Sequence, residues 1–141
     1  MGFLQRFLKY SKICIQCHNN PDADAIAAFF RSELGTTLAN AKNVIREFKF
    51  SILDDANKYF PDVHGESVLL QGVVDCAMIA PEGITIVDFK TDKVSAGSLD
   101  GAVANYKPQV QTYAAALSRI YGLPVKKTAL YFFSLDTLVE L

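Results

Sequence analysis

Residues 67–92 constrain the fold of this chain more than any other stretch, because two apolar runs meet there across a turn. The turn signal is Pro-Glu-Gly at 81–83. Runs rich in β-branched and apolar residues on both sides of such a signal predict a β-hairpin, with strands over 67–80 and 84–90. The second run is apolar on both faces, so we expect it to be a central strand of the sheet.

Three charged residues interrupt this apolar hairpin. Asp75 lies inside the first run, and Asp88 and Lys90 end the second. Side chains two positions apart share a face of a strand, so Asp88 and Lys90 point the same way. A two-residue loop would place Asp75 directly opposite Asp88, whereas a longer loop would shift the register by one residue. Facing carboxylates repel each other, so a sheet core keeps them when a cation lies between them.

The rest of the chain alternates between helical and strand periodicity. Apolar residues at helical spacing predict helices over 3–10, 22–34 and 104–121, and alternation predicts strands over 44–52 and 125–134, with a short edge strand over 137–141. Polar and glycine-rich segments predict loops over 53–66 and 93–101. Gly35 is expected to stop the second helix, and Pro108 to lie in the first turn of the third. This order predicts an α/β fold with a central mixed β-sheet flanked by helices.

Composition sets the broad class of the protein. With 141 residues, 50% apolar and 21% charged, residues 1–141 predict a single globular domain. A net charge of −1 neither requires nor excludes a nucleic-acid partner. No apolar run reaches the ~20 residues of a membrane helix. Three cysteines without a secretory signal predict a cytoplasmic protein with reduced thiols. The chain has no phosphate-binding loop motif, so we expect no ATP site.

A site for chemistry is predicted where these charges meet the long helix. Two carboxylates, Asp75 and Asp88, with water and a substrate phosphate, suit Mg²⁺. Lys90 would lie beside that ion and stabilise developing negative charge. Gln109 and Tyr113, four residues apart, share one face of the helix and could reach the same place. The structural alternative is a buried Asp–Lys ion pair that joins two strands.

Several short segments occur in the order and spacing of a known family. The main matches are Gln71-Gly72-Val73-Val74-Asp75, Asp88-Phe89-Lys90-Thr91-Asp92 and Gln109-Val110-Gln111-Thr112-Tyr113. Further matches are Phe29-Phe30-x-Ser32-x-Leu34-Gly35, Arg46-Glu47-Phe48-x-Phe50, Tyr106-x-Pro108-Gln109 and Tyr131-Phe132-Phe133-Ser134. Together they resemble the RecB-like branch of the PD-(D/E)XK nucleases, and most closely the C-terminal nuclease domains of the AddA/RexA type of helicase–nuclease.

The resemblance implies a restriction-endonuclease-like core and a Mg²⁺-dependent DNA exonuclease domain, in which Mn²⁺ can substitute. It makes Asp75 and Asp88 metal ligands, Lys90 the catalytic lysine, and Gln109 with Tyr113 an accessory helix motif. It also implies partners: DNA, a helicase portion of the same polypeptide, and a second helicase–nuclease polypeptide of the AddB/RexB type, in double-strand-break repair and recombination.

One position departs from that family's pattern. Relatives usually carry a histidine metal ligand on the first helix, at the position of Met1. We therefore expect a nuclease domain excised from the C-terminus of a larger helicase–nuclease, with weak metal binding on its own. Glu47 has two open interpretations: a peripheral metal group, or an acidic residue on an exposed strand face.

Alternatives to this interpretation come from two sources. The Cys14-x-x-Cys17-His18 segment matches haem attachment in its letters, and with His64 it could hold zinc, but we expect thiols and an imidazole in a loop. No haem is expected, and three cysteines cannot supply a four-cysteine iron–sulfur cluster. The rival functions are a non-catalytic DNA-binding or subunit-docking module and a stand-alone Cas4-like or phage-type exonuclease.

Overall fold

The computed structural model of the protein describes residues 23–141. The helix expected over 3–10, the Cys14-x-x-Cys17-His18 segment and the position of Met1 lie outside the described residues. The elements are α2 (Ala23–Arg31), α3 (Glu33–Asn40), β1 (Val44–Asp55), η1 (Ala56–Lys58), β2 (Ser67–Ala80), β3 (Gly83–Lys90), η2 (Ala96–Ser98), α4 (Leu99–Tyr121), β4 (Val125–Phe132), η3 (Phe133–Leu135) and β5 (Thr137–Glu140). Among these described helices, none is long and apolar enough to cross a membrane.

A five-stranded sheet in the order β1-β2-β3-β4-β5 forms the centre of the fold. β3 and β4 run parallel, and the other neighbouring pairs are antiparallel. The parallel pair needs a crossover connection, which α4 supplies. The predicted α/β fold with a mixed sheet is confirmed. β3 is the central strand, as expected from its apolar sequence, and residues 83–89 are all buried.

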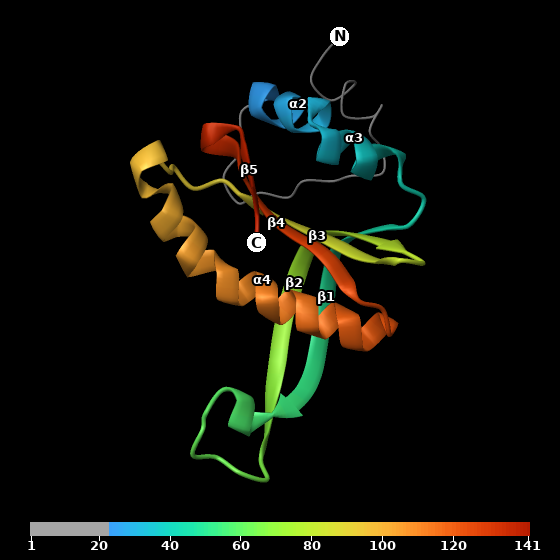
Figure 1. Ribbon diagram of the computed structural model, residues 1–141, viewed down its shortest axis with the longest axis vertical. Coiled ribbons are helices and arrows are strands. Elements are labelled where there is room, and N and C mark those ends of the chain that lie inside the picture. Colours follow the sequence, from blue (N-terminus) through green and yellow to red (C-terminus); the bar gives the residue numbers. More distant parts are fainter. Residues whose placement is uncertain (1–22) are drawn as a thin grey trace.

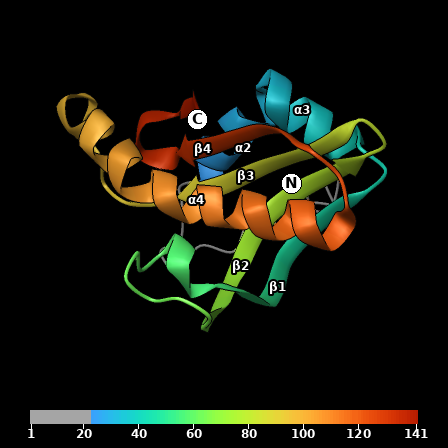
Figure 2. The same ribbon diagram turned by 60° about the horizontal axis from the view of Figure 1, so that its bottom comes forward.

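Helices cover both faces of this sheet (Figure 1). α4 crosses one face, while α2 and α3 lie against the other (Figure 2). Strand alternation divides the core accordingly, because Val87 and Phe89 pack with α2 and α3 whereas Ile84 and Ile86 pack with α4. Asp88 and Lys90 continue the series of Ile84 and Ile86. The sheet therefore presents its two charged β3 residues toward α4.

The helix predicted over 22–34 is wrong at its end, since Gly35 does not stop it. α2 ends at Arg31, and α3 begins directly after Ser32, whose hydroxyl accepts a hydrogen bond from the Gly35 N–H at 3.0 Å. Gly35 lies inside α3 and is buried. A Cβ at Gly35 would lie 2.0 Å from the Phe29 carbonyl oxygen. The glycine is needed for a close approach of two backbones and not for a helix stop.

The start predicted for the long helix is also wrong. α4 begins at Leu99, so Pro108 lies in its interior and not in its first turn. Leu99, Ala102 and Val103 pack against a core cluster of Val110, Leu130 and Phe132, and this tertiary contact extends the helix toward its N-terminus. Ala104 and Pro108 are exposed, so the Ala104 carbonyl that loses its donor can be hydrated. The predicted end is confirmed: Gly122 caps the helix in the left-handed region at φ 65°.

Smaller differences concern the ends of strands and one helix face. β1 continues to Asp55, three residues beyond the predicted strand. Ile120, predicted within the apolar stripe of α4, is 43% exposed, whereas Ala116 is fully buried. Phe133, predicted as strand, begins the 3-10 turn η3, and the edge strand β5 forms where expected. None of these differences moves the charged residues of the hairpin.

Two helical glycines allow a matched test of the α2–α3 junction. We expect Gly35→Ala to lower the free energy of unfolding by about 3 kcal/mol, because the added methyl group meets backbone atoms of Phe29 and Phe30 that cannot move independently. Gly101→Ala, in α4 with open space around its Cα, should leave stability unchanged or raise it by up to about 1 kcal/mol. Urea denaturation followed by circular dichroism measures both. Equal effects of the two substitutions would contradict this interpretation of Gly35.

Candidate active site

The candidate site lies where β2 and β3 separate. Their ladder starts at the Ala80–Gly83 pair, which confirms the two-residue turn, and it ends at the Cys76–Val87 pair. Asp75 and Asp88 are the next residues on the two strands, so the expected alignment brings them to the end of the ladder. Instead of a backbone partner, the Phe89 N–H donates to Asp75 Oδ2 at 2.9 Å. The Asp75 side chain thus bridges the strands at the point where they part.

The β1–β2 ladder is also interrupted beside Asp75. Glu47 and Asp75 lie between the pairs Arg46–Cys76 and Phe48–Val74 but do not pair with each other. Glu47 has φ 45°, a conformation that residues other than glycine seldom adopt.

The interruption changes which face of the sheet the flanking side chains occupy. Val74 packs in the core under α4, whereas Cys76 packs with α2 and α3. Side chains two positions apart normally share a face. The strand therefore changes its facing at Asp75, next to the strained Glu47.

Lys90 connects the carboxylates to α4. Its Nζ lies 2.6 Å from Asp88 Oδ2 and donates to Gln109 Oε1 at 3.0 Å. Gln109 Nε2 in turn donates to the Tyr113 hydroxyl at 2.8 Å. The structural alternative of an ion pair that joins two strands is wrong, because Asp88 and Lys90 belong to the same strand. What this chain of contacts joins is strand β3 and helix α4.

Gly72 makes room for the Tyr113 ring beneath the site. A Cβ at position 72 would lie 2.8 Å from the Phe50 ring and 2.9 Å from Tyr113 Cε1. The Phe50 and Tyr113 rings pack edge to face, with centroids 5.8 Å apart. Tyr113 is therefore held by packing on β1 and β2 while its hydroxyl meets Gln109. The Gly72-x-x-Asp75 spacing in the sequence reflects this close approach.

Burial and mutual repulsion make the two carboxylates costly. Asp88 is only 3% exposed. Burial, followed by repulsion from Asp88, raises the pKa of Asp75 to about 7, although the hydrogen bond from the Phe89 N–H and the Lys90 charge oppose this shift. The uncompensated negative charge at this place is what a bound cation would neutralise.

The residues present fit a hard divalent cation. Asp88 Oδ2 is buried and, although Lys90 is close, receives no hydrogen bond from any residue that the structure describes. Such an orphaned oxygen next to a second carboxylate, Asp75, offers two oxygen ligands, and Mg²⁺ usually takes its remaining positions from water and substrate phosphate. Asp75 and Asp88 are the residues that would hold the ion.

Other candidate ligands do not join this pair. Within residues 23–141 no three His, Cys, Asp or Glu side chains form a group that could hold a metal. Glu47 is exposed, and its role as a peripheral metal group stays a prediction. Cys76 is fully buried in the core, and burial raises the pKa of its thiol to about 12, which makes it a poor metal ligand. His64 instead contacts the Asn57 amide in the loop after β1.

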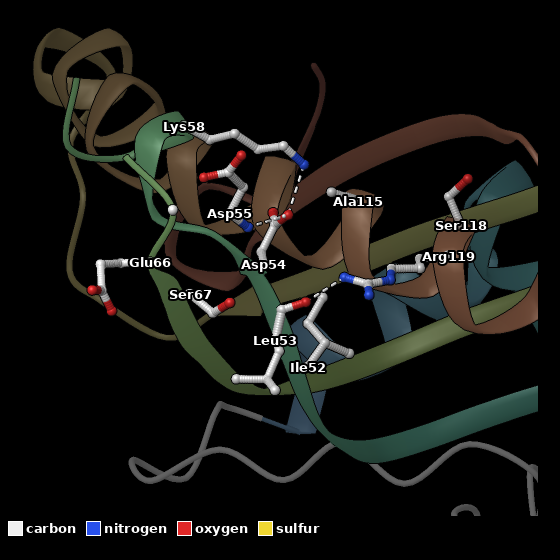
Figure 3. Close-up of a pocket in the computed structure, with 11 residues that line it drawn as sticks. Ile52, Leu53, Asp54, Asp55, Lys58, Glu66, Ser67, Ala115, Ser118 and Arg119 are labelled. Carbon is white, nitrogen blue, oxygen red and sulfur yellow. Dashed lines mark hydrogen bonds and ion pairs between the residues drawn. The ribbon is translucent and has the colours of Figure 1, made fainter. Parts of the chain in front are cut away.

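A separate hollow of about 820 Å³ lies at the far end of β1 and β2 against the C-terminal half of α4 (Figure 3). Its charged groups are already paired: Lys58 with Asp54 at 2.7 Å, and Arg119 with the Leu53 carbonyl. None of the five predicted site residues lines it. The hollow and the carboxylate site are therefore distinct features.

The structure brings together all five residues that the sequence predicted for the site: Asp75, Asp88, Lys90, Gln109 and Tyr113. It also adds Tyr106, whose ring lies under the Lys90 ammonium with Nζ 3.8 Å from the centroid. The sequence held a signal for this contact, because Tyr106 precedes Gln109 by three residues and so lies on the same helix face. Asp92, which accepts a hydrogen bond from the Tyr106 hydroxyl, could not be assigned without the structure.

Comparisons with known proteins agree with this geometry. Residues 9–140 match the model of the PD-(D/E)XK nuclease superfamily. The chain is 39% identical over 117 residues to the A-type polypeptide of the ATP-dependent helicase/nuclease of Acetivibrio thermocellus, covering 79% of this chain and 9% of that protein. It is 38% identical over 128 residues to the protein of the same name from Bacillus mycoides, covering 84% of this chain and 10% of that protein.

The chain spans about a tenth of the length of these curated relatives. The match to the superfamily model covers nearly all of it and includes every residue of the candidate site. The mixed sheet flanked by helices is consistent with the restriction-endonuclease-like fold of that superfamily. This chain therefore belongs to the PD-(D/E)XK nuclease superfamily.

Proposed function

We propose that this chain is a Mg²⁺-dependent nuclease domain that hydrolyses DNA phosphodiester bonds. The observation that supports this most is the meeting of Asp75 and Asp88, two largely buried carboxylates, beside the Lys90 ammonium. A structural ion pair would need one carboxylate for one lysine. Here a second carboxylate is kept nearby although it raises the electrostatic cost, which a catalytic site for a phosphate diester explains.

Each residue has a chemical role in this proposal. Asp75 and Asp88 hold the ion, which polarises a phosphoryl oxygen and lowers the pKa of a bound water. Lys90 presents its ammonium where negative charge develops on the phosphate during attack. Gln109 holds Lys90 through its amide oxygen, and Tyr113 holds the Gln109 amide nitrogen. Lys90 therefore enters the reaction with its ammonium already oriented by α4.

The wider setting is proposed from the names of the relatives, which are polypeptides of ATP-dependent helicase/nucleases. We propose that this chain is the C-terminal nuclease domain of such a polypeptide, an exonuclease that acts on DNA in double-strand-break repair in the cytoplasm. Its partners would be the helicase portion of the same polypeptide and a second polypeptide of the AddB/RexB type.

One observation favours the rival function, a non-catalytic DNA-binding or subunit-docking module. Lys90 lies within ion-pair distance of Asp88, so an ammonium already occupies part of the space beside the carboxylates. In a docking module this pair would be permanent. The two functions differ in whether Asp88 is needed for DNA cleavage.

Substitution of Asp88 separates these functions. In the full polypeptide with Mg²⁺, we expect Asp88→Asn to reduce DNA hydrolysis by about 100-fold or more, since even residues behind a metal ligand are worth roughly 10- to 100-fold. Lys90→Gln should cost roughly 100- to 1,000-fold, the range for one group that stabilises developing charge. The exposed Asp100, in the first turn of α4, supplies the control Asp100→Asn. Parent-level cleavage by Asp88→Asn would show that the site is not catalytic.

A second prediction concerns stability without metal. Because the pKa of Asp75 is raised from 3.8 to about 7 on folding, the folded state binds an extra proton between these values, and stability falls as pH rises through that window. Above the raised pKa, near pH ~8, the full penalty is present. Asp75→Asn should therefore raise the free energy of unfolding at this pH by about 1 kcal/mol or more.

Mg²⁺ should reverse this order. The ion stabilises the parent chain by binding its folded state, whereas Asp75→Asn should gain little. Thermal denaturation at about pH 5 and about pH 8, with and without Mg²⁺, measures both effects. If Asp75→Asn is less stable than the parent at the higher pH without metal, Asp75 is a structural residue and the electrostatic argument is wrong.

A further inference from the structure

Lys90 has one contact that the proposed chemistry leaves unexplained, namely the face of the Tyr106 ring. The ammonium lies 3.8 Å from the ring centroid. An ammonium within about 6 Å of a tyrosine face is attracted by the negative potential of the ring. Lys90 is thus held on three sides, by the Asp88 carboxylate, the Gln109 amide and the Tyr106 ring.

The Tyr106 ring is itself fixed from two directions. Its hydroxyl donates to Asp92 Oδ2, two residues after Lys90 in the chain. Its ring packs against the fully buried Phe132 of β4, with centroids 6.4 Å apart. The hydrogen bond to Asp92, followed by burial, raises the pKa of Tyr106 to about 12, so the phenol stays neutral and continues to donate.

The three contacts differ in what else they can do. The Asp88 carboxylate and the Gln109 amide are polar groups, for which a cation or a phosphate competes with Lys90. The Tyr106 ring has no such competing partner. A lysine side chain is long and flexible and loses considerable rotamer freedom when ordered. A contact that persists while the polar groups exchange partners would keep the ammonium in place.

We propose that Tyr106, oriented by Asp92, is a positioning residue that holds the Lys90 ammonium for phosphodiester hydrolysis. This inference rests on the proposed nuclease function. Tyr106, Gln109 and Tyr113 follow one helix face at i, i+3 and i+7. Together they form a single support for Lys90, of which Tyr106 is the outermost residue.

Kinetics of the full polypeptide on DNA with Mg²⁺ test the role of Tyr106. Tyr106→Leu should lower kcat roughly 10-fold with little change in KM, within the range that cation–π contacts are worth. Tyr106→Phe keeps the ring and loses only the bond to Asp92, so its loss should stay within about 3-fold. Asp92→Asn keeps an acceptor for the hydroxyl and should match the parent. Tyr121→Leu is the matched control, because Tyr121 lies on the same helix and packs on Phe48, away from Lys90.

Dependence on Lys90 distinguishes positioning from a general structural role. In a Lys90→Gln background, Tyr106→Leu should cost no further activity, because the group that it positions is gone. A second readout is independent of cleavage. In nuclear magnetic resonance spectra of the metal-free chain, the Lys90 ε-methylene protons should be shifted upfield by the ring in the parent and in Tyr106→Phe, but not in Tyr106→Leu.

Three results would overturn the proposal in different ways. An equal loss from Tyr106→Leu with and without Lys90 would make Tyr106 a structural residue. A raised KM with unchanged kcat would make it a DNA contact. A parent polypeptide that cleaves no DNA in Mg²⁺ would remove the proposed nuclease function, and the positioning role with it, even if the ring shift of the Lys90 protons is present.

Discussion

The separation of β2 and β3 beyond Cys76 and Val87 is the constraint on which the site depends. If the strands stayed paired, Asp75 and Asp88 would lie directly opposite each other in a continuous ladder, where like charges are unfavourable. Because the ladder ends there, the Phe89 N–H is free to donate to the Asp75 carboxylate. The same opening leaves an Asp88 oxygen buried without a donor among the described residues. The sheet gives up backbone hydrogen bonds at this point and gains a place for two acids.

Helix α4 makes this opening usable for chemistry. It crosses the face of the sheet toward which Asp88 and Lys90 point, and it carries Tyr106, Gln109 and Tyr113 along one side (Figure 2). As the crossover between the parallel strands β3 and β4, the helix is held at both of its ends by the sheet. The orientation of the lysine therefore depends on the same packing that closes the core.

Sequence reasoning was most successful where a pattern had a single physical cause. Alternation and the two-residue turn predicted the hairpin register, and helical spacing predicted that Gln109 and Tyr113 share a face. It failed where tertiary contacts override local signals: Gly35 serves a backbone approach inside α3, and packing of Leu99 extends α4 past Pro108.

The partners of single side chains were beyond sequence reasoning as well. The left-handed Glu47 and the Tyr106–Asp92 bond both depend on how two segments meet in space. No local pattern specifies such a meeting. These two features nevertheless lie beside Asp75 and Lys90, so the least predictable parts of the fold adjoin its candidate site.

The most direct test of the central claim is where a divalent ion binds. Crystals of the chain soaked in Mn²⁺, examined by anomalous diffraction, should show a peak bonded to carboxylate oxygens of both Asp75 and Asp88, with Lys90 Nζ displaced from Asp88 and still over the Tyr106 ring. The peak should disappear in Asp88→Asn crystals and persist in Asp100→Asn crystals. A peak bonded to other residues, or an Asp88–Lys90 ion pair unchanged at saturating Mn²⁺, would contradict a metal-dependent nuclease site at this opening of the sheet.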